Sequence, residues 1–339
     1  MKQKAWHTFL FIFLSVLLIF SVIYTVSIGA TELTFGDAYS VILDKMFYGG
    51  ARIEAGEFPK SMYKIVWQIR LPRTLFALCV GAGLAVCGAA MQSLVLNPIA
   101  DPYVLGVSSG ASAGAAIALL APIAFLEGQR QTTAFAFIGA LTAAFVVYFL
   151  AKRAGGGKLQ PVTLLLAGTA VNAVMSAITS YLVFKARSPE GIAAVYNWQM
   201  GAISAAQWKT LAIPAGFVLA GAVVFSCMGS RFNMMMMGDE DAAAMGLRVR
   251  LFRSVMFIVV SVVVASLVSI TGIIGFVGLV VLLFGKTDYV QGIMETLGAK
   301  NLLTFAFAFA GVNSLVEAAA NAVLGGALGS VLLKLKKRI

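Results

Sequence analysis

Long apolar runs, separated by short polar segments, dominate the chain. Most runs reach about 20 residues, the length that a helix needs to cross the hydrocarbon core of a bilayer. Apolar residues follow one another without alternating with polar ones, so the pattern predicts helices and not the strands of a membrane barrel. We therefore expect an all-α polytopic membrane protein with about ten spans. They lie near residues 8–28, 71–93, 104–124, 132–151, 161–184, 208–228, 252–270, 272–285, 300–312 and 315–335.

The composition agrees with lipid as the main solvent of the chain. Hydrophobic residues make up 60% of the sequence and charged residues 12%, whereas a soluble domain carries about 25% charged residues. The net charge of +11 fits cytoplasmic loops rich in Lys and Arg better than a nucleic-acid-binding surface. The distribution of these basic residues predicts that both termini are cytoplasmic and that residues 31–69 form an exoplasmic loop. The first apolar run exceeds the core of a signal peptide, so we interpret it as an uncleaved span.

Few polar side chains interrupt the predicted spans. Glu317 is the only acid placed inside one, and this scarcity argues against a carrier driven by protons or sodium. The stretch GVSSGASAG at 106–114 contains small residues that let helices approach closely, and it predicts a tight helix contact. Our candidates for a polar translocation path are Gln92, Asn172, Ser176 and Thr179.

The sequence predicts neither a metal site nor a nucleotide site. Its three cysteines lack the spacing of metal ligands, and its single histidine precedes the first span. Gly285-Lys286-Thr287 resembles the end of a phosphate loop, but Val280 stands where that loop needs a glycine. We expect no metal, no cofactor and no catalytic residue in this chain. If ATP drives the protein, another chain binds the ATP.

An acidic segment interrupts the apolar pattern at residues 231–250, which read RFNMMMMGDEDAAAMGLRVR. Asp239 is a good N-cap, and Glu240 and Asp241 suit the first turn of a helix. Gly246 suits a left-handed stop. The resulting helix is under two turns long, so it needs support from elsewhere, and the methionines of the segment offer adaptable apolar contacts. An ordinary solvated turn between spans is the alternative.

Two further turns lie on the predicted cytoplasmic side. In the first, prolines disfavour helix at the residues before them, and an Asn or Asp caps the helix that follows. In the second, consecutive glycines allow large changes of the backbone. A structural turn and a flexible loop, respectively, are the simpler interpretations. The residues are Asn97, Pro98, Asp101 and Pro102 in the first turn and Gly155, Gly156 and Gly157 in the second.

Several stretches together resemble one family of membrane proteins. Residues 69–114 read IRLPRTLFALCVGAGLAVCGAAMQSLVLNPIADPYVLGVSSGASAG, which resembles the FecCD family of ABC-importer permeases that move ferric siderophores, haem and cobalamin. After Val281 the chain departs from the family pattern, because LLF stands where the family continues with Pro-His. Further matching stretches, in family order, are LLLAGTAVNAV at 164–174, YNWQMGAIS at 196–204, GDEDAAAMGL at 238–247 and TGIIGFVGLVV at 271–281.

The resemblance implies a type II ABC-importer permease architecture, with a single transmembrane permease domain over residues 1–339. It implies work with a second permease subunit (a copy or a paralogue), an ABC ATPase dimer that binds ATP-Mg, and an extracytoplasmic substrate-binding protein. The setting would be the lipid bilayer of the bacterial cytoplasmic (inner) membrane, and no nucleic acid would be involved. Ferric siderophore is the first expected cargo, and cobalamin or haem is the second.

The resemblance also implies roles for particular residues. The cytoplasmic segment 229–251 would contain a coupling helix that sits in a cleft of the ATPase. Arg70 and Arg73 would meet acidic residues of the binding protein, unless they only anchor the helix at the membrane interface. The inner gate of the family lies near the three-glycine turn. The residues of the coupling site would be Gly238, Asp239, Glu240, Asp241, Ala244, Met245 and Gly246.

Two other interpretations stay open at this point. A secondary carrier or channel would act without an ATPase, although such a carrier usually needs buried carboxylates or a comparable ion site. A transport-inactive divergent homologue would fit the altered sequence after Val281.

Overall fold

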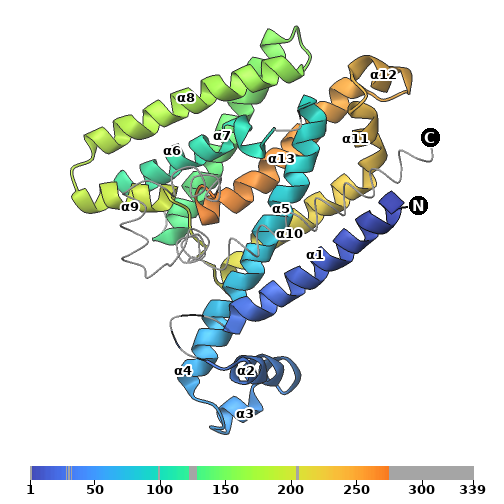
Figure 1. The fold of residues 1–339 in the computed structure, drawn as a ribbon. Helices are drawn as coiled ribbons and strands as arrows, with labels where there is room; N and C mark the ends of the chain where they lie inside the picture. The colour runs from blue at the N-terminus through green and yellow to red at the C-terminus, as the bar shows by residue number, and fades with distance from the viewer. Residues whose placement is uncertain are drawn as a thin grey trace, which may run out of the picture. The chain divides into compact units, whose positions relative to one another are not determined.

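The computed structural model describes residues 2–274, apart from residues 28, 30, 32, 98–99, 122–127 and 204–205. Every regular element in this part of the chain is a helix (Figure 1), so the prediction of an all-α protein is confirmed. Pro98, Glu317, the predicted spans near 300–312 and 315–335, and nearly all of the span near 272–285 lie outside the described residues.

Five described helices are long and apolar enough to cross a membrane, judged by length and composition. Two shorter apolar helices, Ile12–Ser27 and Val107–Leu120, accompany them. Each of these helices coincides with one of the spans predicted between residues 8 and 270, as a polytopic membrane protein requires. The five long helices are Lys60–Val95, Gln129–Ala154, Pro161–Lys185, Trp208–Cys227 and Val249–Thr271.

One compact unit of the chain comprises, among the described residues, those up to 81 and the segment 203–212. Thr34 opens a helix here through a capping box, in which its hydroxyl accepts from the Asp37 amide at 3.2 Å and the Asp37 carboxylate accepts from the Thr34 amide at 3.4 Å. Most residues of the predicted loop 31–69 lie in helices. Its elements follow α1 (Lys2–Ser27) and are α2 (Phe35–Phe47), α3 (Ala51–Glu54), α4 (Lys60–Tyr63) and the π-helix η1 (Lys64–Arg70).

The helix of the second predicted span begins at Lys60 rather than near Leu71. The elements α4, η1 and α5 (Leu71–Val95) follow one another over 36 residues without a break. Val66 in η1 is fully buried in a small core with Val41 of α2 and Val26 of α1. The helix extends beyond the apolar run because this core gives its first turns apolar surface to pack against.

A second compact unit comprises, among the described residues, 82–202 and 213–274. It contains a helix that the sequence analysis did not predict, in which the Ser188 hydroxyl accepts from the Gly191 amide at 2.9 Å and Pro189 occupies the first turn. The elements after α5 are the 3₁₀ helix η2 (Pro102–Leu105), α6 (Val107–Leu120), α7 (Gln129–Ala154), α8 (Pro161–Lys185), the unpredicted α9 (Pro189–Gln199), α10 (Trp208–Cys227), α11 (Gly229–Met235), α12 (Asp239–Ala244) and α13 (Val249–Thr271).

Small residues bring α6 and α7 together, as the stretch 106–114 predicted. A methyl group on Gly110 would overlap the carbonyl of Gly139, and one on Gly114 would overlap the carbonyl of Phe135. Close backbone approach of this kind stabilises helix pairs in lipid, where burial of apolar surface supplies little driving force. The contact fixes α6, which forms part of the polar cavity described below.

Candidate functional site

The acidic segment forms the short helix α12, six residues long. Its N-cap is Gly238, and no side chain caps it. The prediction of Asp239 as the N-cap is therefore wrong, because this residue is already helical and its carboxylate is engaged elsewhere. The predicted stop is confirmed, since Gly246 adopts a left-handed φ of 86° and its amide donates to the Ala243 carbonyl at 2.9 Å.

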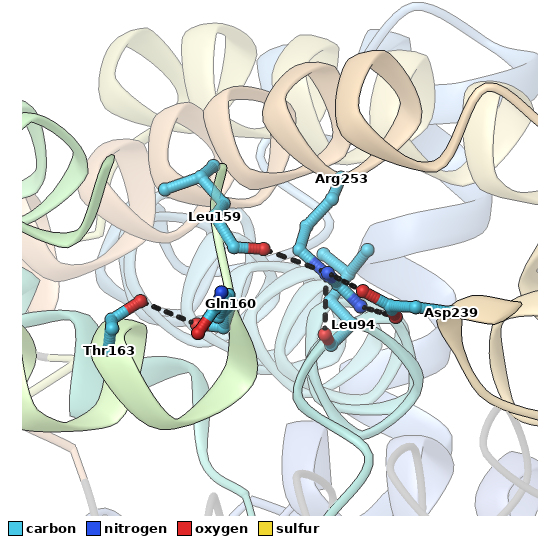
Figure 2. Close-up of polar contacts among 6 residues, drawn as sticks. All are labelled: Leu94, Leu159, Gln160, Thr163, Asp239 and Arg253. Carbon is cyan, nitrogen blue, oxygen red and sulfur yellow. Dashed lines mark hydrogen bonds and ion pairs between the residues drawn. The ribbon is translucent and has the colours of Figure 1, made fainter. Parts of the chain in front are cut away.

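Asp239 forms a two-pronged ion pair with Arg253 in the second turn of α13 (Figure 2). Nη2 of Arg253 donates to Oδ1 at 2.6 Å, and Nη1 donates to Oδ2 at 2.8 Å. Paired N–H donors facing a carboxylate make one of the stronger polar contacts in proteins. The hydrogen bond from Arg253 holds the pKa of Asp239 below its ordinary value, although partial burial acts in the opposite direction.

The Arg253 guanidinium also binds two backbone carbonyls. Nε donates to the Leu94 carbonyl at 3.0 Å, and Nη1 donates to the Leu159 carbonyl at 2.8 Å. Arg253 thus joins four segments, namely the end of α5, the link before α8, the helix α12 and its own helix α13. Arg253 was not among the site residues predicted from the sequence. Its position five residues into an apolar helix, where a charge is costly unless it is paired, was the signal.

The exposed surface of α12 and of the turn that precedes it combines acids with apolar side chains. Glu240, Asp241 and Ala244 are exposed, and Met236 and Met237 each expose 61% of their surface. Ala242 is buried and Met235 is fully buried, so Met235 does not contribute to a docking surface as the methionine run suggested. The exposed part is suited to a partner that offers basic and apolar groups.

The described residues of the two predicted turns form local hydrogen bonds and left-handed turns. The Asp101 carboxylate accepts from the Tyr103 amide at 2.7 Å and so caps η2, as predicted. At the end of α7, Gly156 and Gly157 adopt left-handed φ values of 62° and 84°, which favour glycine. The link they form leads directly to Leu159, whose carbonyl is bound by Arg253. A gating role for either turn stays a prediction.

A polar cavity of about 240 Å³ brings together three of the four candidates for the translocation path. Asn172, Ser176 and Thr179 of α8 line it, whereas Gln92 is exposed and does not. The opposite walls on α6 and α9 were not predicted from the sequence; there, Gln199 donates to the Ser112 hydroxyl at 2.8 Å. Among the described residues, its lining offers amides and hydroxyls and no charged side chain. The other lining residues are Ser108, Ser109, Ser112, Ser180, Val183, Tyr196, Gln199 and Ile273.

Arg70 and Arg73 differ in their surroundings. The Arg70 side chain is buried, and its guanidinium donates to the carbonyls of Val26, Ser27 and Thr31 at 3.2, 2.7 and 2.8 Å. These bonds supply donors to the C-terminal end of α1, where helical carbonyls lack partners. Arg73 is half-buried. Arg70 therefore binds backbone within its own unit, a role that neither the docking nor the membrane-interface interpretation predicted. Docking by Arg73 stays a prediction.

The described residues contain no group of three or more His, Cys, Asp or Glu side chains that could hold a metal ion. Three polar arrangements among the described residues bear on the predicted sites. They are the Arg253 cluster (Leu94, Leu159, Asp239 and Arg253), the Arg70 cluster (Val26, Ser27, Thr31 and Arg70) and the polar cavity beside α8.

Three curated relatives share about half of their length with this chain. The cobalamin import system permease protein BtuC of Halobacterium salinarum is 39% identical over 210 residues, which are 62% of this chain and 55% of the relative. The hemin transport system permease protein HmuU of Yersinia pestis is 35% identical over 56% of each chain. The ferric enterobactin transport system permease protein FepD of Escherichia coli is 38% identical over 55% of this chain and 54% of its own.

A solved structure has the same fold. It is described as a metal-chelate type ABC transporter in an inward-facing conformation, and it aligns with a TM-score of 0.66 over 93% of this chain and 87% of its own, at 22% identity. The sequence pattern of the FecCD transport family matches residues 17–287, which are most of the chain. The chain belongs to the FecCD transport family.

Proposed function

We propose that the chain is the permease subunit of an ATP-driven ABC importer, with ATP hydrolysed by a separate ATPase dimer. The observation that supports this most directly is α12, a short acidic helix that is tied to a membrane-spanning helix by the Asp239–Arg253 pair while its outer face is exposed. Such a helix is too short to be stable alone, and its exposed acids, together with Met236 and Met237 in the turn before it, fit a docking surface. ATP binding would close the ATPases and displace α12.

The remaining parts of the proposal follow from the family. A second permease subunit, a copy or a paralogue, would complete the translocation path, and an extracytoplasmic binding protein would deliver cargo. Both termini and the coupling segment 229–251 would face the cytoplasm of a bacterial inner membrane. The path would run by Asn172, Ser176 and Thr179, whose neutral polar groups suit a cargo that must pass without being held tightly.

The expected cargo is a metal chelate. The relatives carry names that refer to cobalamin, hemin and ferric enterobactin, which all enclose a metal in an organic ligand. Ferric siderophore is our first candidate and cobalamin or haem the second. The uncharged walls of the cavity are compatible with a large ligand whose own charge is shielded.

A charge reversal on α12 tests the coupling role. In proteoliposomes that contain the ATPase and the binding protein, Glu240→Arg combined with Asp241→Arg should insert normally but lose ATP-driven uptake of radiolabelled ferric siderophore. Glu54→Arg, a reversal of an exposed acid on α3, is the matched control and should keep uptake. Normal uptake by the double variant would contradict the proposal.

The same assay separates the other two functions. Uptake that continues without the ATPase would identify a secondary carrier or channel. Absence of uptake by the unaltered chain, with ATPase, binding protein and each of the three cargo classes supplied in turn, would identify a transport-inactive homologue.

A further inference from the structure

We propose that Arg253 is a positioning residue that carries the movement of α12 to the end of α5 and to the link before α8. This inference rests on the proposed function, because it assigns a path to the motion that the ATPase would impose. The Arg253 guanidinium binds all of these segments. All three nitrogens of Arg253 are used, two of them on Asp239 and two on backbone carbonyls, with Nη1 shared (Figure 2).

The two carbonyls need a donor from outside their own helices. The residue four positions after Leu94 is Pro98, which has no amide hydrogen to complete the helical bond. Leu159 precedes Gln160, the N-cap residue of α8, and so lies outside the helical ladder. Arg253 therefore satisfies two groups that helix geometry leaves open, and a displaced guanidinium would leave both without this donor.

The two partners of the ion pair differ in burial. The Arg253 side chain is 2% exposed, whereas the Asp239 side chain is 42% exposed. The cation is fixed inside the unit, and its carboxylate belongs to the short helix at the surface. A buried guanidinium that loses its carboxylate is strongly destabilised. Movement of α12 must then either pull Arg253 along or be resisted by it, and both outcomes connect α12 to the carbonyls of Leu94 and Leu159.

The segments reached by Arg253 are suited to respond. The link to α8 starts with the left-handed Gly156 and Gly157, which permit rearrangement. On its other side, Gln160 caps nothing with its side chain, but its carbonyl accepts from the Thr163 hydroxyl at 3.0 Å, so the residue after Leu159 is bonded to the first turn of α8 (Figure 2). The helix that follows carries Asn172, Ser176 and Thr179 to the polar cavity.

The test measures cargo moved per ATP hydrolysed in proteoliposomes with the ATPase and binding protein. Asp239→Asn keeps the shape of the side chain but presents an amide N–H to a donor, so the ratio should fall about tenfold while the ATPase still co-purifies. Arg253→Lys keeps the charge and the ion pair but cannot reach the carboxylate and both carbonyls together, so it should also lower the ratio. Glu54→Gln is the control and should leave the ratio unchanged.

The outcomes distinguish this inference from the proposed function. A normal ratio in either variant would overturn the positioning role while leaving the proposed function intact. Loss of ATPase co-purification by Asp239→Asn would also overturn it, because α12 would then act only as a docking surface. An unaltered chain that moves no cargo with ATP would instead remove the proposed function, and the positioning role with it.

Discussion

Two buried arginines, one in each compact unit, both donate to carbonyls at helix ends, but their other partners differ. Arg70 binds the carbonyls that end α1, and Arg253 binds a carbonyl that ends α5. Among the described residues, the acceptors of Arg70 are all backbone carbonyls, whereas Arg253 also faces the carboxylate of Asp239. A guanidinium held by backbone alone stabilises a fixed helix end. One held partly by a carboxylate on a short surface helix also connects that helix to the buried helix ends.

The two arginines also differ in how well the sequence predicted their roles. Arg70 lies in a recognisable family motif and was expected to dock a partner protein, yet its side chain is used up inside the unit. Arg253 lies outside the stretches that resemble the family, yet it forms an ion pair with Asp239 of the candidate coupling helix. A position in a motif therefore does not tell in which direction a long side chain points, because the five donors of arginine fit either a partner or the backbone.

The largest expected effect is that of Arg253→Met. Methionine fills similar space but leaves the carbonyls of Leu94 and Leu159 without this donor and frees Asp239, so the free energy of unfolding should fall by about 3 kcal/mol. Thermal unfolding in detergent micelles would measure it. Arg250→Met is the matched control, because Arg250 is exposed on the same helix, and it should leave the melting temperature nearly unchanged. Equal melting of both variants would show that the Arg253 cluster adds nothing to stability.

A smaller effect is expected for Arg70→Met. Here the loss is of hydrogen bonds from a charged donor to neutral carbonyls, and no carboxylate is left behind, so we expect about 2 kcal/mol. The same unfolding experiment, joined to a binding assay with the substrate-binding protein, would sharpen the comparison. If Arg70 acts by binding these carbonyls, Arg70→Met lowers the free energy of unfolding. A variant with unchanged stability and weaker binding would return Arg70 to the docking role predicted from the sequence.

Of the two arginine clusters, only that of Arg253 contains a carboxylate, so only this one should weaken in acid. The pKa of Asp239 is lowered by Arg253, so its contribution to stability is present above the ordinary carboxyl pKa and is lost as the pH falls through the lower pKa of the folded state. Melting temperatures measured from about pH 6 down to about pH 3 should fall less steeply for Asp239→Asn than for the unaltered chain. Parallel curves would mean that the ion pair is not what Arg253 contributes.

The smallest effect is expected at Lys158, which lies beside the link before α8. Its charge also lowers the pKa of Asp239, but more weakly than Arg253 does. Lys158 is exposed, so Lys158→Met should change stability by only about 0.5 kcal/mol, and added salt should erase the difference. A salt-resistant effect of several times that size would place Lys158 inside the cluster instead of beside it.

Much of the fold was predictable because the bilayer imposes a simple rule. Apolar runs of sufficient length become helices, and each span predicted between residues 8 and 270 coincides with a described apolar helix, although the helix of the second begins at Lys60 instead of near Leu71. The glycine stretch in α6 and the stop at Gly246 followed from steric limits that apply to any sequence. The helices of the 31–69 segment and α9 were not predicted, because they are short and their stability depends on packing and caps more than on long apolar patterns.

The candidate site was predictable only in part. The position of α12 followed from its acids and glycines, and the polar stripe of α8 pointed to Asn172, Ser176 and Thr179. The wrong N-cap at Asp239 has one cause, namely that a carboxylate within reach of a guanidinium binds it in preference to a backbone amide. Gln92 was grouped with the stripe of α8 by its polarity alone, and polarity does not report which face of a helix meets which neighbour.

The sequence by itself determined that this chain is helical, crosses a membrane and has the stretches of the FecCD transport family, because hydrophobic length and local steric rules act within short windows. Only the tertiary structure decided which polar groups meet. Leu94, Leu159, Asp239 and Arg253 are separated by up to 159 positions along the chain, and no local pattern relates them. They come together because a buried guanidinium must find acceptors, and the packing of the helices determines which acceptors are within its reach.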